Sequence, residues 1–323
     1  MVNSNLPAAV SSILVVRLGA MGDIIHALPA AASLKHSFPR AKVTWVVEKH
    51  WVPLLEGNGF VDRIVVFHRR EPSTWAATRQ ELRSQKYDLA VDFQGLIKSA
   101  LIAHMSAPEK IVGYGRGAVR ERPAGWFYSA RTEVSAVHVV EKGLELARFA
   151  GASNLVRVFP LPSGKAEQPL PSEPFVLASP LAGWTSKQWP LEYWARLAEL
   201  LKDRLRMPLV LDGAPGTIPA IPHTLPHESS VQGLLHVTRK AAVVVGVDSG
   251  PLHLAAALGK SGVAIFGPTD PARNGPYGGD FTVLRHPGSH TTHRRGKVID
   301  PSMRAITPEQ VFQAIETAIP CPA

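Results

Sequence analysis

The chain has 323 residues, of which 45% are hydrophobic, and a mean hydropathy of +0.03, so it is long enough for two globular domains and is not disordered. The net charge of +9 favours anionic partners, but the chain has no run of Lys or Arg and no nucleic-acid-binding motif, which argues against nucleic acid. The single cysteine, Cys321, excludes a disulfide framework and a cysteine metal cluster.

The N-terminal residues lack the basic and then apolar order of a signal peptide. No segment offers the roughly 20 consecutive apolar residues that a membrane span needs. We therefore expect a protein of a reducing, cytoplasmic compartment that touches a membrane only at its surface.

The first predicted strand is 13–16, and the loop 17–23 leads from it into a helix with apolar residues at helical spacing. Asp23 stands at the start of this helix, over the carboxyl end of the strand. A carboxylate there can act as a general base or can simply stabilise the N-terminus of its own helix, and the residues alone leave both open. Gly19 and Gly22 form only a G-x-x-G pattern, which is a weak dinucleotide signal.

Further strands are predicted at 41–47, 63–67 and 88–93, the last running into the loop QGLIKS. A loop rich in Gly and Arg then precedes a helix that contains His138. Arginines on loops are more often solvated charge than ligands, and we assign Arg116 and Arg122 to that class.

The proline-rich segment 159–174 resists regular structure and predicts an interdomain linker. A second sheet begins at 175–178, and its loop carries Lys187 before a helix that begins at Leu191. A strand at 209–211 follows. Near the C-terminus, Thr307, Pro308 and Gln310 have the spacing of a capped helix start.

The most informative stretch is 243–271. The β-branched run 243–247 predicts a buried parallel strand, and the turn Asp248-Ser249-Gly250-Pro251 leads into a helix that Gly259 ends; a second strand follows at 263–266. A helix that begins where a parallel strand ends presents free N–H groups, so an anion such as phosphate can bind there, and His253 can face the same place. Any βαβ unit gives a similar pattern, so the pattern alone leaves a structural interpretation open.

This stretch, VDSGPLHLAAALGKSGVAIFGPTDP, closely resembles the nucleotide-sugar-binding segment of the lipopolysaccharide heptosyltransferases, glycosyltransferase family 9. Three further motifs resemble the same family in the same order: RLGAMGDIIHALPA, the D-x-QGLxKS loop and GWTSKQWP. The resemblance extends from Ile13 to Ile315.

The resemblance implies an α/β protein of the GT-B fold, with two doubly wound Rossmann-like domains facing a central cleft. Residues 1–160 would form an acceptor-binding domain and 161–174 a linker. Residues 175–305 would form a nucleotide-sugar-binding domain, and 306–323 a C-terminal helix that crosses back to the first domain.

Site residues follow from the resemblance position by position. Asp23 would be the catalytic base, and Lys187 would stabilise the departing diphosphate. The implied donor contacts are Gly22, Lys187, Asp248, Ser249, Gly250 and His253. The implied acceptor contacts are Arg69, Arg70, Gln94, Lys98, Arg120 and His138.

The sequence departs from the family at two places. The family has a lysine shortly after its arginine pair, where this chain has Glu71-Pro72-Ser73, so the detail of the acceptor site differs. Many members have a glutamate, thought to hold the adenosine ribose, after the turn that here is 212–215. This chain has Gly216-Thr217 in its place, and the helix after it is expected to be abbreviated.

The reaction that the resemblance implies is the inverting transfer of a heptose from ADP-heptose to a Kdo residue of Kdo-lipid A in the lipopolysaccharide inner core. No D-x-D pair occurs, so the interpretation includes no metal and no cofactor. Because the acceptor is a glycolipid, the basic protein is expected to dock on anionic headgroups at the inner face of the inner membrane.

Three alternatives stay open at this point. A family member could move a different sugar or use a heptose as acceptor. An NAD-dependent dehydrogenase could use Gly19, Gly22 and Glu48, the residue near the end of the second strand. A non-catalytic nucleotide-sugar-binding or lipid-binding protein could keep the same fold.

Overall fold

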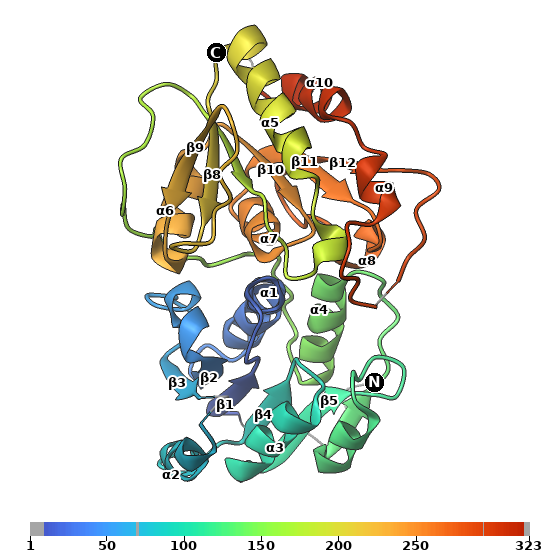
Figure 1. Cartoon of the computed structure of the whole chain (residues 1–323). Coiled ribbons are helices and arrows are strands. Elements are labelled where there is room, and N and C mark those ends of the chain that lie inside the picture. The colour runs from blue at the N-terminus through green and yellow to red at the C-terminus, as the bar shows by residue number, and fades with distance from the viewer. Residues whose placement is uncertain (1–9, 69–70, 293, 320–323) are drawn as a thin grey trace. The chain divides into compact units, whose positions relative to one another are not determined.

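The computed structural model describes residues 10–68, 71–292 and 294–319, and the chain divides into two compact units between Pro162 and Ser163. Each unit contains one six-stranded sheet whose paired strands all run parallel (Figure 1). None of the described helices is long and apolar enough to cross a membrane.

The N-terminal unit has the strand order β3-β2-β1-β4-β5-β6. Its strands are β1 (Ser12–Val16), β2 (Lys42–Glu48), β3 (Arg63–Phe67), β4 (Leu89–Asp92), β5 (Lys110–Tyr114) and β6 (Ala130–Thr132). Its α-helices are α1 (Met21–Ser37), α2 (Trp75–Leu82), α3 (Ile97–Met105) and α4 (Val139–Phe149), with short 3-10 helices at Lys49–Leu54, Pro72–Thr74 and Arg122–Phe127. The four predicted strands are confirmed to within one residue at each end, whereas β5 and β6 were not predicted.

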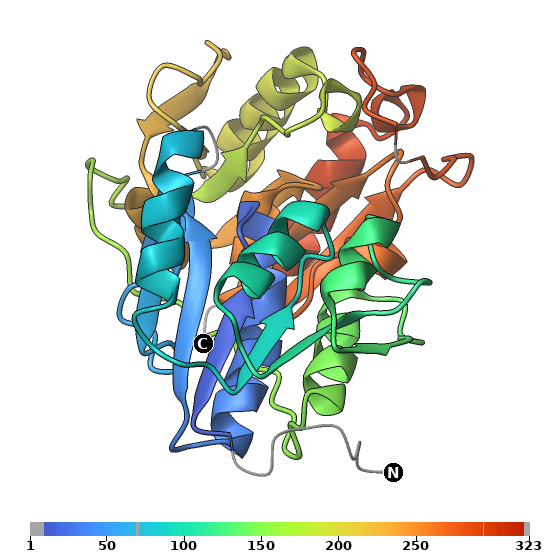
Figure 2. The same ribbon diagram turned by 90° about the horizontal axis from the view of Figure 1, so that it is seen from below.

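Helices cover both faces of this sheet. α1 and α4 pack against each other, while α3 packs on β1 and β4, and Figure 2 shows α3 lying in front of the strands. All but the first residue of β1 are buried, which explains why its sequence, SILVV, is continuously apolar instead of alternating. Leu14, Val46 and Phe67 belong to the core between the sheet and α3.

The C-terminal unit has the strand order β12-β11-β10-β7-β8-β9. Its strands are β7 (Val176–Ser179), β8 (Leu209–Gly213), β9 (Thr224–Glu228), β10 (Val243–Val247), β11 (Ser261–Phe266) and β12 (Asp280–Arg285). Its helices are α5 (Leu191–Leu200), continued by a π-helical turn at Leu201–Leu205, then α6 (Val231–Lys240), α7 (Gly250–Ala257), α8 (Pro271–Asn274), α9 (Pro301–Arg304) and α10 (Pro308–Ala318), with a 3-10 turn at Thr185–Lys187. The predicted strands β7, β8, β10 and β11 and the predicted starts of α5, α7 and α10 are confirmed.

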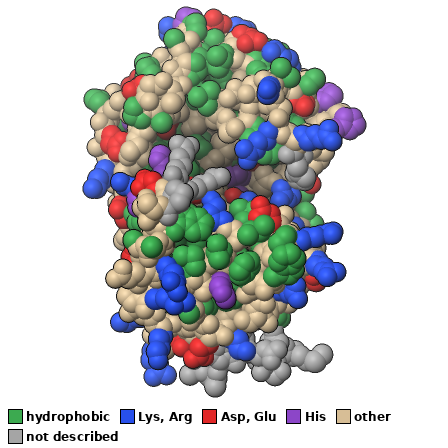
Figure 3. Space-filling model, turned by 60° about the horizontal axis from the view of Figure 1, so that its bottom comes forward, with side chains coloured by type: hydrophobic (Ala, Val, Ile, Leu, Met, Phe, Trp, Pro, Cys, Tyr) green, Lys and Arg blue, Asp and Glu red, His purple; other side chains and the backbone are tan. Residues whose placement is uncertain are grey.

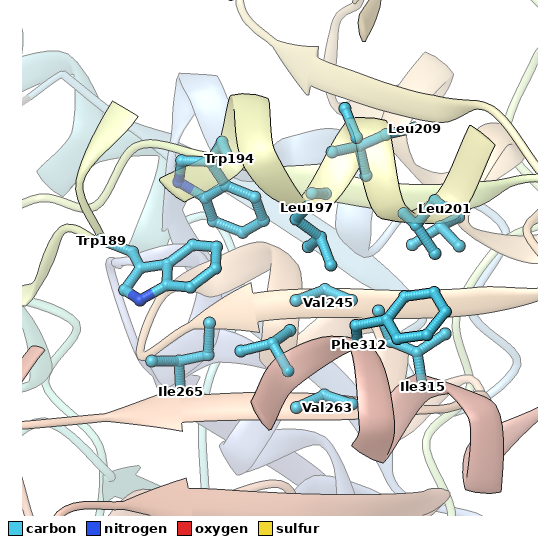
Figure 4. Close-up of a cluster of buried hydrophobic side chains, with 14 of the residues drawn as sticks. Trp189, Trp194, Leu197, Leu201, Leu209, Val245, Val263, Ile265, Phe312 and Ile315 are labelled. Atoms are coloured by element: carbon cyan, nitrogen blue, oxygen red, sulfur yellow. The ribbon is translucent and has the colours of Figure 1, made fainter. Parts of the chain in front are cut away.

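The C-terminal helix begins where the sequence predicts. α10 has the predicted capping box, because Thr307 accepts from Gln310 N–H and the Gln310 side chain accepts from Thr307 N–H. The helix packs on α5 and β11 of the C-terminal unit, and a crossing of residues 306–323 back to the first domain stays a prediction. Its Phe312 and Ile315 face the buried side chains of α5 and the strands, including Trp194 (Figure 4).

The predicted linker, 161–174, stays a prediction. The division of the chain falls inside it, but its later part is packed on the C-terminal unit. Lys165 N–H donates to the Gln232 carbonyl at 3.0 Å, and the Glu167 carboxylate accepts from the N–H and hydroxyl of Ser230 at 2.7 and 2.5 Å. These bonds fix residues beyond Pro162 to the start of α6.

No helix joins β8 to β9 in the described chain, which confirms the abbreviated helix expected after Gly216-Thr217. The connecting segment contains Pro215, Pro219 and Pro222, and prolines at this density resist helix formation. Gly216 N–H donates to the Glu228 carboxylate at 2.9 Å, so the loop is fastened to the end of β9.

Candidate active site

In the N-terminal sheet the strand order reverses between β1 and β4, and the loops that follow these two strands meet at the carboxyl edge, where ligands bind in such folds. Asp23 lies in the first turn of α1 at this edge. Its Oδ1 pairs with Arg17 Nη2 at 2.5 Å and with Arg120 Nη2 at 3.0 Å. Its Oδ2 accepts from Ala20 N–H at 3.4 Å, so the carboxylate also stabilises its own helix start.

The two guanidinium groups differ in exposure. The Arg17 side chain is 6% exposed and its Nη1 also donates to the Phe93 carbonyl, whereas the Arg120 side chain is 42% exposed. Burial alone would raise the pKa of Asp23, which is 29% exposed, but the charges of Arg17 and Arg120 outweigh it and hold that pKa well below its usual range. Asp23 is therefore a carboxylate at neutral pH, able to accept a proton.

A buried network joins the loops after β1 and β4. Asp92, at the end of β4, is fully buried and accepts from Ser99 Oγ at 2.8 Å and from Tyr128 OH at 2.7 Å. It also accepts from the N–H groups of Gln94 and Gly95. Burial raises the pKa of Asp92, and the hydrogen bonds from Tyr128 and Ser99 offset only part of that rise.

The Gln94 side chain extends this network toward Asp23. Gln94 Oε1 accepts from Leu18 N–H at 2.9 Å, directly beyond Arg17 in the chain. The loop that leads to Asp23 is thus held by the loop after β4. Acceptor binding by Gln94 stays a prediction. The side-chain oxygen of Gln94 already accepts the hydrogen bond from Leu18 N–H.

Replacing Tyr128 with Phe is expected to lower the free energy of unfolding by about 1.5 to 3 kcal/mol, because the change removes a hydrogen bond to a buried carboxyl group and leaves the ring in place. Urea denaturation of parent and variant measures the difference. Tyr87→Phe is the matched control: its hydroxyl is buried without a hydrogen-bond partner among the described residues, so the change should be nearly neutral. Equal losses in the two variants would contradict the assigned role of Asp92.

The other predicted residues of this unit lie as follows. Lys98 is half-buried with its Nζ 5.8 Å from the centre of the Phe67 ring. His138 caps α4, accepting from Val140 N–H, and its ring lies edge-on against His26, one turn after Asp23. Gly22 is buried in α1 beside Asp23. Arg69 and Arg70 lie outside the described residues.

The surroundings of Gly19 argue against a dinucleotide site in this unit. A Cβ atom added at Gly19 would lie 2.9 Å from Trp51 Nε1, so the indole fills the space on that side of the backbone. Glu48 ends β2, where its N–H donates to the Leu18 carbonyl at 3.0 Å.

In the C-terminal sheet the strand order reverses between β7 and β10, and Asp248 follows β10 at this point. Its side chain is 6% exposed and collects three partners. Oδ1 lies 3.3 Å from His253 Nε2 and accepts from Asn274 Nδ2 at 3.0 Å, and Oδ2 pairs with Lys187 Nζ at 3.1 Å. Burial would raise the pKa of Asp248, but His253 and Lys187 outweigh it and hold that pKa well below its usual range.

Lys187 is positioned by this carboxylate. Its Nζ also donates to the Asp248 backbone carbonyl at 2.7 Å and lies 4.9 Å from the centre of the Trp184 ring. An ammonium group has three N–H bonds, and Asp248 takes two of them, which leaves one for an anion beside the start of α7.

Hydroxyl groups gather along the same sheet edge. The side-chain oxygens of Ser186, Ser249 and Thr269 are buried and have no hydrogen-bond partner among the described residues. They belong to the loops that follow β7, β10 and β11, three neighbouring strands. Ser249 is also the N-cap of α7 without a side-chain capping bond, so the first N–H groups of that helix are open to an anion.

Sequence reasoning missed Arg17 and Asn274 as members of the two clusters. Arg17 carried a usable signal, because it directly follows a buried apolar strand, and ligand-binding residues of parallel sheets gather at the carboxyl ends of their strands. Asn274 carried none: it contacts Asp248 only through the fold, from α8 on the neighbouring loop.

Comparison with known proteins places the chain in a family. The model of glycosyltransferase family 9 (heptosyltransferase) matches residues 75–301. Lipopolysaccharide heptosyltransferase 1 of Escherichia coli is 32% identical over 309 residues, covering 85% of this chain and 93% of the relative. The enzyme of the same name from Pseudomonas aeruginosa is 31% identical over 294 residues, covering 82% and 81%.

Solved structures agree. Escherichia coli heptosyltransferase WaaC with ADP superimposes with a TM-score of 0.77 at 26% identity, covering 95% of this chain and 99% of that one, and the same enzyme with ADP-2-deoxy-2-fluoro heptose gives 0.75 at 27%. The dehydrogenase and the non-catalytic binding protein that the sequence left open are contradicted by these matches. With two parallel six-stranded sheets of the GT-B type, the chain belongs to glycosyltransferase family 9, the heptosyltransferases, and acts in lipopolysaccharide core synthesis.

Proposed function

We propose that this heptosyltransferase moves a heptose from ADP-heptose to the Kdo sugar of Kdo-lipid A, with inversion at the anomeric carbon. The observation that carries the donor assignment is the cluster at the start of α7. A fixed ammonium group, open helix N–H groups and buried hydroxyls without partners among the described residues converge there, which suits a diphosphate. The ADP complexes of the similar Escherichia coli enzyme support the same donor class.

The chemistry is a single displacement. Asp23 takes the proton of the acceptor hydroxyl as the oxygen forms its bond to the anomeric carbon, and the bond from that carbon to the ADP oxygen breaks. Attack from the face opposite the leaving group inverts the centre. The departing ADP gathers negative charge, which Lys187, His253 and the N–H groups of Ser249 and Gly250 stabilise.

The acceptor side rests on Arg120 and on the predicted pair Arg69 and Arg70. A Kdo sugar carries a carboxylate, and a guanidinium group can bind it with two parallel hydrogen bonds. Of the predicted acceptor contacts in the described chain, Arg120 has its exposed guanidinium group beside Asp23. Lys98 and His138 extend the proposed acceptor surface.

ADP release measured with ADP-heptose and Kdo-lipid A tests this proposal. The expected result is release that depends on the acceptor and is absent with lipid A that lacks Kdo. Release that requires a heptose-bearing core, or a donor other than ADP-heptose, would replace the proposed substrates with those of another family member.

We also propose that the enzyme works on the inner face of the inner membrane as a peripheral protein. Trp126 is 84% exposed and lines a shallow pocket together with Arg116, Arg122 and Arg131, none of which forms an ion pair with the described residues. Ile97, at the start of the adjacent α3, is also exposed. Figure 3 shows hydrophobic side chains gathered on the lower part of the surface in view, with Lys and Arg side chains around them. Such a mixture suits anionic headgroups.

Arg122→Gln is expected to weaken binding to vesicles containing anionic lipid about fivefold, since one basic residue near such a surface contributes about 1 kcal/mol. Co-sedimentation at low and high salt measures the change. Arg40→Gln, which removes an exposed arginine just before β2 at the opposite edge of the sheet, should leave binding unchanged. Equal effects of the two substitutions would contradict docking through this patch.

A further inference from the structure

Two arginines share one oxygen of Asp23, the proposed base, and only one of them is fixed. Arg17 is buried and has a second partner in the Phe93 carbonyl. Arg120 is exposed, and the only hydrogen bond of its side chain to the described residues goes to Asp23 Oδ1. Its backbone is held in place, because Glu121 N–H donates to the Gly95 carbonyl at 2.9 Å. Arg120 can therefore change partner by turning its side chain alone.

We propose that Arg120 is an exchangeable counter-ion of Asp23: it pairs with Asp23 when no acceptor is bound and turns to an anionic group of the acceptor when one is, releasing the base. This inference rests on the proposed function in taking Asp23 as the base and an anionic sugar as acceptor. The anionic group of the acceptor is a carboxylate or a phosphate. Either of them accepts two parallel hydrogen bonds from a guanidinium group.

The exchange would make the base strong only when it is needed. A carboxylate paired with two cations holds its proton weakly, and losing one cation raises its pKa. The exposed arginine also covers Asp23 Oδ1, the oxygen that both pairs share. Without this pairing, Asp23 could take a proton from water instead. The water oxygen would then bond to the anomeric carbon, ADP would leave, and the donor would be hydrolysed.

Other charged groups near Asp23 do not offer the same exchange. The titratable and charged groups that face Asp23 or Arg17 are His26 on α1, Asp92 at the end of β4, Tyr114 at the end of β5 and Arg120 on the loop after it. His138, on α4, faces His26. Of this set, Asp92, His26 and Tyr114 are buried, which leaves Arg120 as the exposed cation of the described cluster.

The test compares Arg120→Gln with the parent and with Arg40→Gln, which removes the same charge at the opposite edge of the sheet. ADP release is measured with ADP-heptose alone and with ADP-heptose plus Kdo-lipid A. In Arg120→Gln the ratio of acceptor-free release to transfer should rise at least about tenfold, because transfer loses an acceptor contact while water gains a stronger base. Adding Asp23→Asn should abolish the gain, and Arg120→Lys, which keeps the charge, should give a smaller ratio than Arg120→Gln.

A second readout needs no substrate. Titration of the Asp23 carboxyl carbon by NMR in the free protein should show a pKa higher by about one unit or more in Arg120→Gln than in the parent, and no change in Arg40→Gln. An unchanged ratio together with an unchanged Asp23 pKa would overturn the exchange. A parent enzyme that shows no acceptor-dependent ADP release would instead refute the proposed function, and the NMR comparison would still decide whether Arg120 is the counter-ion.

Discussion

Asp23→Asn is expected to lower kcat for heptose transfer by about 10²-fold to 10⁴-fold while ADP binds with nearly the parent affinity. The amide has the shape of the carboxylate but cannot take up the proton of the acceptor hydroxyl. The residues proposed to hold ADP, such as Lys187 and Asp248, belong to the C-terminal unit and are unchanged. Initial rates of ADP release and calorimetric titration with ADP measure the two quantities.

The control for this substitution must distinguish the effect of losing the base from the effect of losing an ion pair. Asp62→Asn removes the partner of Lys35, at 2.8 Å, in the same unit but just before β3, at the amino edge of the sheet. It should leave kcat unchanged. Melting temperatures of both variants show whether either is unfolded under assay conditions, since Asp23→Asn leaves the buried Arg17 without its anion. A folded Asp23→Asn enzyme with parent kcat would remove Asp23 from the mechanism.

Asp248→Asn is expected to lower the free energy of unfolding by about 3 kcal/mol and to weaken ADP binding strongly. The substitution removes a buried charge on which Lys187 and His253 converge, leaving an ammonium group that is 14% exposed without its counter-ion. Lys187 would then lose the contact that aims it at the diphosphate. Urea denaturation measures the first effect, and titration with ADP measures the second.

Asp203→Asn is the matched control, because this exposed aspartate in the turn after α5 forms no ion pair with the described residues. It should change neither stability nor ADP affinity. If Asp248→Asn bound ADP as the parent does, the diphosphate would have to lie elsewhere. A stability loss no larger than that of Asp203→Asn would contradict the strength assigned to the buried cluster.

The stability difference between the parent and Asp248→Asn is also expected to depend on pH. The pKa of Asp248 is lower in the folded protein than the value of about 3.9 in an unfolded chain, so its contribution is fully present above that value. The contribution declines as the pH falls below about 4 and is lost as the pH falls through the folded pKa. Urea titrations at a series of pH values should therefore show a constant difference near neutrality that shrinks in acid. A difference that grew in acid would have the wrong sign for a paired carboxylate.

The sequence predicted the strands at the centre of each sheet and the edge strand β3 but missed β5, β6, β9 and β12, and for the edge strands β9 and β12 the reason is physical. β1 and β10 are buried on both faces, so each is a continuous run of β-branched or aliphatic residues that cannot be mistaken for a surface helix. β9, TLPHE, and β12, DFTVLR, are edge strands with exposed polar positions, and β9 contains a proline. Hydrogen bonds to a neighbouring strand define such segments, and a single sequence does not display those partners.

The same limit applies to the site. Asp23 and Asp248 could be placed because each follows a parallel strand at the carboxyl edge of its sheet. The partners of these two carboxylates could not be predicted, because Arg120 lies 97 residues from Asp23 in the sequence and Asn274 lies 26 residues from Asp248. The packing of the C-terminal helix could not be predicted for a related reason: its amphipathic face fits any apolar surface, and only the fold brings Phe312 onto the C-terminal core.

In the proposed mechanism the nucleotide binds the C-terminal unit at the start of α7, while the base belongs to the N-terminal unit. A crystal structure of this protein with ADP tests it most directly. We expect diphosphate oxygens within hydrogen-bond distance of Lys187 Nζ and of the N–H groups of Ser249 and Gly250. ADP bound instead at the turn between β1 and α1, beside Gly19 and Gly22, would contradict it.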